Sequence, residues 1–184
     1  VRHVIAGARG TVSLALETGS IPRLEFEFMG LYAEPTDLDL PAVTFGEQAD
    51  PLVVNSQHTS NVDVFGYAAC LQSFSLGASN EVVYRQLAGC ARQVRLTDRK
   101  PEGEISIEAP TLAQKNYFAQ VSSQQLGNVG WTHGTTAGNI VSFSAPTCNL
   151  GGAGYGDSDG VMLLDMPFMP NPANGNDEFS LILT

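Results

Sequence analysis

Apolar and polar residues alternate with a period of two along several stretches of the chain. This period is typical of β-strands, because successive side chains of a strand point to opposite faces of a sheet. We therefore predict a strand at each stretch, with its apolar residues facing a core. The stretches are residues 11–17, 23–28, 93–97, 104–108 and 179–183.

Turn-forming residues separate these stretches. The sequence Lys-Pro-Glu-Gly at 100–103 lies between two alternating stretches, which predicts a hairpin of 93–97 with 104–108. Residues 36–51 have little periodicity, are acidic and are long for a connection. We expect this loop to make functional or intersubunit contacts.

Residues 111–125 contain no Gly or Pro and place several apolar residues on one side of a helix. Thr111 is a plausible N-cap, so we predict a helix of about three to four turns that ends near Gln125. The sequence as a whole predicts a single mainly-β domain over residues 1–184. Its expected architecture is a β-sandwich or a partly closed β-barrel with one flanking α-helix.

The charge balance narrows the function. Among 184 residues, 19 are acidic and nine are Lys or Arg, which gives a formal net charge of −10. Such a chain repels phosphates, so a protein that binds DNA or RNA tightly is disfavoured. The sequence has no stretch of about 20 apolar residues and no signal-peptide pattern, so we expect a protein without a membrane anchor.

Candidate chemistry is sparse. Cys70, Cys90 and Cys148 form no metal-binding or disulfide pattern, and we expect buried reduced thiols. The histidines at 3, 58 and 133 lie far apart, outside known catalytic motifs. The Asp-Ser-Asp-Gly sequence at 157–160 resembles the start of a calcium loop, but Phe168 stands where the last ligand should be. We therefore interpret it as a turn and expect no metal or cofactor.

Five of the nine basic residues lie within positions 85–100. In an acidic protein, such a patch favours pairing with the acidic surface of a neighbouring copy over binding to DNA.

Several segments together resemble the tail tube proteins of long-tailed, non-contractile bacteriophages and their prophage relatives. The resemblance extends from about Ala8 to Thr184. The segments are IPRLEFEFMGLY at 21–32, PTD at 35–37, VYR at 83–85, TDRKP at 97–101, ISIEAPT at 105–111, THGTTAGN at 132–139 and YGDSDG at 155–160.

The resemblance implies a structural subunit and no enzyme. Members form hexameric rings that stack into a tube, the conduit for genome delivery. It implies a place in the virion tail, assembly in the host bacterial cytoplasm, and tail tip and tail terminator proteins as partners. Double-stranded DNA would pass without specific binding. Because the chain starts at Val1 and family members extend further on that side, we expect that it lacks an opening segment of a longer protein.

An acidic lumen would let DNA slide without sticking. Our candidates for lumen-facing residues are Glu25, Glu27, Glu104 and Glu108, which alternate with apolar neighbours. Glutamates that only cover the outer surface are the other interpretation. The candidates for intersubunit contacts come from the 36–51 loop and the 100–103 turn. They are Thr36, Asp37, Asp39, Phe45, Glu47, Arg99, Lys100 and Glu102.

Two other functions remain open. One is a ligand-binding or carbohydrate-binding β-sandwich module of a virion or prophage, although such modules usually display clustered aromatic residues and Trp131 is the single Trp. The other is a hydrolase with a carboxylate pair, for which Asp157 and Asp159 are the only suggestion.

Overall fold

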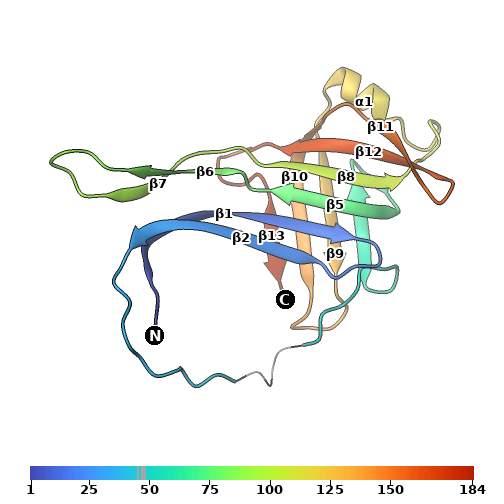
Figure 1. The fold of residues 1–184 in the computed structure, drawn as a ribbon. Coiled ribbons are helices and arrows are strands. Elements are labelled where there is room, and N and C mark those ends of the chain that lie inside the picture. Colours follow the sequence, from blue (N-terminus) through green and yellow to red (C-terminus); the bar gives the residue numbers. More distant parts are fainter. Residues whose placement is uncertain (45, 47–48) are drawn as a thin grey trace.

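The computed structural model describes residues 1–44, 46 and 49–184. The fold is mainly β, with 53% strand and 4% helix. Antiparallel strands form two layers of one continuous sheet (Figure 1). The first layer, in spatial order, is β2 (Arg23–Tyr32), β1 (Ile5–Glu17), β5 (Leu71–Gly77), β8 (Glu102–Glu108), β12 (Val161–Pro170) and β11 (Gly154–Ser158). The second is β13 (Ser180–Leu183), β10 (Val141–Leu150), β9 (Gly127–His133), β3 (Thr59–Val64) and β4 (Tyr67–Ala68).

The two layers join at a corner where β12 pairs with the end of β10, from Cys148 opposite Pro170 to Leu150 opposite Phe168. Strands β9 and β10 run across the direction of β5 and β8 in Figure 1. The sheet is not closed into a barrel. Of the two predicted architectures, the β-sandwich is therefore the one that is found.

The core lies between the layers and has Phe74 of β5 at its centre. The ring of Phe74 lies 5.7 Å from that of Trp131, 4.9 Å from that of Phe143 and 5.6 Å from that of Phe168, measured between centroids. These partners come from β9, β10 and β12, so one side chain connects both layers. The alternation predicted for β8 is confirmed on its apolar side, because Ile105 and Ile107 are fully buried.

The predicted hairpin between residues 93–97 and 104–108 is wrong. Strand β7 (Gln93–Arg99) pairs with β6 (Asn80–Arg85) to form a separate two-stranded ribbon, whereas β8 pairs with β5 and β12. The segment between β7 and β8 therefore carries the chain from the ribbon into the main sheet. Turn chemistry predicts where a strand ends but not which strand pairs with it.

The predicted helix is present but shorter than 111–125. Helix α1 spans Tyr117–Ser123, and its N-cap is Asn116, whose side chain accepts a hydrogen bond from the amide of Ala119. Thr111 instead begins a separate turn, in which the amides of Gln114 and Lys115 donate to its carbonyl. An Asn side chain competes with the backbone for hydrogen bonds and therefore favours a helix start.

The β1–β2 hairpin has an apolar side that the second layer covers only in part. Leu14 and Leu24 line one apolar pocket with Phe179, just before β13, and Leu181 of β13. Further along the hairpin, Phe26 and Phe28 stack on each other and are 60% and 59% exposed. The expectation that the apolar side of residues 23–28 faces the core is therefore wrong for these two phenylalanines.

Candidate functional site

The four candidate lumen glutamates lie on one face of the first layer. Strand register sets this arrangement, because residues directly opposite each other in neighbouring strands point to the same side of a sheet. One row runs from Glu25 of β2 through Ser13 and Gly77 to Glu102 of β8. Glu27 lies two residues from Glu25, and Glu104 and Glu108 lie two and six residues from Glu102. We call this surface the acidic face, defined by Glu25, Glu27, Glu104 and Glu108.

The acidic face is exposed and its carboxylates are unpaired. All four glutamates are exposed, and none forms an ion pair with any residue that the structure describes. The register also places Arg23 on this face, and the strands β1 and β5 separate the glutamates of β2 from those of β8. The small residues between them, Ser13 and Gly77, leave the carboxylates open to solvent. The face therefore presents unpaired carboxylates to the outside.

The connector, which we define as residues 33–51 between β2 and β3, is hydrogen-bonded near both ends in the part that the structure describes. At its end, the side-chain amide of Asn139 donates to the carbonyl of Asp50 at 3.4 Å. Thr36 forms an isolated bridge with Arg2 through backbone hydrogen bonds of 2.7 and 3.1 Å. Beyond it, Asp37 and Asp39 are exposed, and Leu40 is 95% exposed. Phe45 and Glu47, two of the candidate contact residues, lie outside the described residues. The described part of the predicted contact loop is thus an exposed segment.

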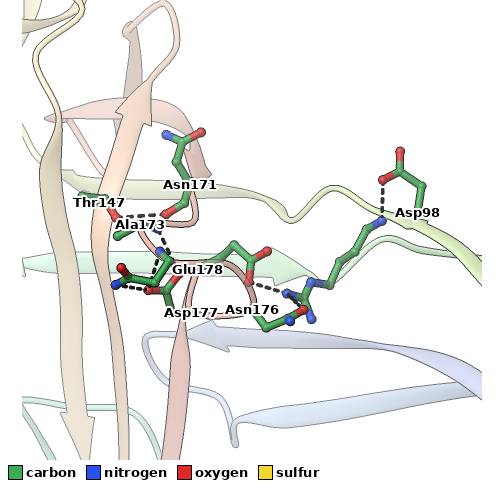
Figure 2. A network of polar contacts seen from close by, with 9 residues as sticks. Asp98, Thr147, Asn171, Ala173, Asn176, Asp177 and Glu178 are labelled. Atoms are coloured by element: carbon green, nitrogen blue, oxygen red, sulfur yellow. Dashed lines mark hydrogen bonds and ion pairs between the residues drawn. The ribbon is translucent and has the colours of Figure 1, made fainter.

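A polar network anchors the ribbon to the loop before β13, and Figure 2 displays it. The guanidinium of Arg99 donates to Glu178 at 2.5 Å and to Asn176 at 3.1 Å. Glu178 is buried, and its bond to Arg99 lowers the pKa of its carboxyl group below the usual value. Arg99, predicted as an intersubunit contact, thus bonds within its own chain.

The next two contact candidates form a second ion pair in the same segment. Lys100 and Glu102 approach to 2.9 Å, and both are exposed. Glu102 raises the pKa of the Lys100 ammonium group through its hydrogen bond and its charge. Both side chains remain accessible from outside.

The exposed apolar strip on the β1–β2 hairpin was not among the sequence-based candidates. Phe26 and Phe28 lie on its surface, on the side opposite the acidic face, and Ile5 and Tyr32 extend it at 54% and 84% exposure. Alternation predicts the strand but gives no information on whether a second layer reaches it. The signal that could have found this strip is the number of large apolar side chains on one side of a single strand, at Leu24, Phe26, Phe28 and Tyr32.

The histidines and cysteines do not converge. His133 is buried, and its Nδ1 forms a hydrogen bond of 2.9 Å with Thr59 Oγ1. Burial lowers the pKa of its imidazole. The expectation of buried thiols holds for Cys148 but is wrong for Cys70 and Cys90, which are exposed. Within the described residues, no group of three His, Cys, Asp or Glu side chains is arranged to hold a metal.

The Asp-Ser-Asp-Gly sequence forms the tight turn between β11 and β12. Asp159 and Gly160 both have positive φ, 54° and 81°, as a two-residue hairpin turn of this type requires. The carboxylate of Asp157 accepts a hydrogen bond from the amide of Gly160 at 3.4 Å. The interpretation as a turn is confirmed.

The family is decided by a comparison with protein-family models, in which the model described as "Phage tail tube protein" matches residues 1–170. The chain belongs to the phage tail tube protein family. A tail tube subunit is a structural component of the virion tail that assembles with further copies into a tube. This membership confirms the resemblance inferred from the sequence. A search of curated proteins found no match.

A helix that crosses a membrane must be long and apolar. In the part of the chain that the structure describes, no helix has the length and apolar character needed to cross a membrane.

Proposed function

We propose that this tail tube subunit closes into rings of six that stack, and that the acidic face lines the channel through which the genome passes. The observation that carries the proposal is the gathering of Glu25, Glu27, Glu104 and Glu108 on one exposed face of one sheet. Double-stranded DNA carries a negative charge about every 1.7 Å, so an acidic wall keeps it from binding. The duplex then slides along the channel without specific contacts.

The edges of the first layer support closure into a ring. Strand β2 is ten residues long and has β1 on one side only, and β11 ends the layer at the other side. An exposed edge strand with apolar side chains pairs readily with another chain. A ring joins such edges in a closed circle, and the exposed Phe26 and Phe28 become covered by a neighbouring copy.

Further expectations rest on the family resemblance. Tail tip and tail terminator proteins would close the two ends of the tube, and assembly would take place in the host bacterial cytoplasm. We propose that the subunit has no enzymatic activity and binds no cofactor. Electron microscopy of concentrated protein tests the central point: rings or tubes support the proposal, and uniform monomers favour a binding module.

The acidic face has a direct test. We expect the variant E25K/E27K/E104K/E108K to fold, because substitutions at exposed positions usually change stability by about 0.5 kcal/mol. Virions assembled from it should eject DNA slowly or incompletely, since each lysine attracts phosphates that must be released as the duplex moves. The measurement is the rate of DNA release from purified virions.

A matched variant with Gln at the same four positions distinguishes the effect of attracting phosphates from the effect of losing the negative charges. It removes the carboxylates without adding cations, so it should retard ejection less than the lysine variant. Ejection at the normal rate from virions that carry all four lysines would remove these glutamates from the channel wall.

The connector has its own test. Deleting residues 38–49 should leave a folded monomer that does not assemble, because the residues of this segment that the structure describes are all exposed. Circular dichroism measures folding, and sedimentation velocity measures assembly. A deletion variant that assembles normally, or one that unfolds, would show that the connector has another role.

A further inference from the structure

The β6–β7 ribbon projects from the sandwich (Figure 1), and its two faces differ in their exposure. On one face, Val94 is buried and Val82 lies near Thr11, Glu27 and Met29 of the β1–β2 hairpin. The other face carries Val83, Arg85 and Arg95, which the register places on one side of the ribbon. A two-stranded ribbon is marginally stable alone, so a free face of this kind is suited to a partner.

The free face contains a cleft of about 210 Å³ near the tip of the ribbon. Arg85 and Arg95 line it together with Gln93, and Leu87 and Ala91 give it an apolar part. Neither arginine forms an ion pair with a residue that the structure describes. Two guanidinium groups beside an apolar surface suit a carboxylate that is flanked by aliphatic side chains.

The ribbon and the connector have opposite charges. Residues 82–97 contain three arginines and no acidic residue, whereas residues 33–51 contain five acidic residues and no Lys or Arg. Within the connector, Asp37 and Asp39 alternate with Leu38 and Leu40, which are 53% and 95% exposed. Residues 37–40 therefore present the chemistry that the cleft is suited to bind.

We propose that the cleft on the ribbon of one copy binds residues 37–40 of a second copy. In Figure 1 the ribbon projects above the β1–β2 hairpin and the connector runs below it, so the two do not meet within one chain. The contact is heterologous, because each copy offers a ribbon to one neighbour and a connector to another. Such a contact closes a ring or continues along a tube. This contact rests on the proposed function, and it assigns the ribbon and the connector as the surfaces that join the subunits.

A charge exchange tests the contact. The variants R85E/R95E and D37R/D39R should each lose at least tenfold in association constant in sedimentation experiments. A 1:1 mixture of the two should recover association, because each ribbon then meets a connector of opposite charge. The control R85K/R95K keeps both positive charges. On its own, it should associate at least as strongly as R85E/R95E does in the mixture. Normal association of R85E/R95E alone, or no recovery in the mixture, would overturn the proposal.

A disulfide test works even where rings do not form. Cys90 lines the cleft and is exposed, so D39C in a C70S background should form an intermolecular disulfide with Cys90 on mild oxidation. Peptide mass spectrometry identifies the linked pair, and C90S is the control that should abolish it. Absence of the 39–90 link in concentrated protein would overturn the contact.

The two tests separate this contact from the ring. Rings that persist in R85E/R95E would overturn the contact and leave the tube proposal in place. A 39–90 link in protein that never forms rings would support the contact and count against the tube. The cleft could instead bind nucleic acid phosphates: retardation of a DNA fragment that R85E/R95E abolishes, without any 39–90 link, would overturn the proposal in favour of that ligand.

Discussion

Strands β8 and β2 have the same alternation of apolar and acidic residues, and they differ in what covers their apolar side. In β8, Ile105 and Ile107 are fully buried between the two layers. In β2, Phe26 and Phe28 are 60% and 59% exposed, although a phenylalanine side chain has a larger apolar surface than an isoleucine side chain. Both strands present their glutamates to the same outer face.

The difference lies in the reach of the second layer. Strand β8 lies in the middle of the sheet, with β9 and β10 across it, whereas β2 is an edge strand. Apolar surface left uncovered on an edge marks a place where a partner binds. The middle of the sandwich therefore buries its apolar side chains within one chain, and we propose that other copies cover the β2 edge.

The largest expected effect is in the middle of the sandwich. Phe74→Ala removes the ring that contacts Trp131, Phe143 and Phe168, and should lower the free energy of unfolding by about 3–5 kcal/mol. Urea denaturation of the monomer measures this loss. A change below about 1 kcal/mol would mean that the two layers do not depend on this contact.

An intermediate effect is expected where the ribbon meets the sandwich. Glu178→Gln should cost about 1 kcal/mol at neutral pH, since Arg99 is 34% exposed and solvent weakens the ion pair. Arg99 lowers the pKa of the Glu178 carboxyl below its usual 4.5. The contribution of this ion pair to the free energy of unfolding is therefore present above pH 4.5 and is lost as the pH falls through the lowered pKa.

Thermal melts between pH 7 and pH 3 measure this dependence. The wild-type chain should lose stability below pH 4.5 more steeply than Glu178→Gln does. Glu102→Gln is the matched control, because its partner Lys100 is exposed and the pair adds little. Equal pH profiles of the wild type and Glu178→Gln would contradict a stabilising ion pair with Arg99.

The smallest effect on monomer stability is expected at the β2 edge. F26S/F28S should change the free energy of unfolding by less than about 1 kcal/mol, because both rings are already in contact with water. Assembly should be strongly reduced, which sedimentation velocity measures. A loss of stability as large as that of Phe74→Ala would show that the edge is part of the core of the monomer and not a contact surface.

Several features could be predicted from the sequence because they depend on neighbouring residues. Alternation predicted the strands at residues 11–17, 23–28 and 104–108, and the turn at Asp159 and Gly160 follows from residues that tolerate positive φ. The family could be identified in the same way, because its segments are themselves strands and turns.

Pairing and burial could not be predicted in this way. The sequence at residues 100–103 has the composition of a hairpin turn, yet β7 pairs with β6, since strand pairing depends on segments far apart in the chain. The same holds for Arg99, whose partner Glu178 lies 79 residues away.

The sequence by itself determined which residues alternate, where the chain turns and how strongly acidic the protein is, because these are properties of residues close together in the chain. Only the tertiary structure decided that Glu25 and Glu104 share one face and that Phe26 and Phe28 are left uncovered. The physical reason is that a face is made by the register of strands distant in sequence, and burial by whether a second layer extends over it.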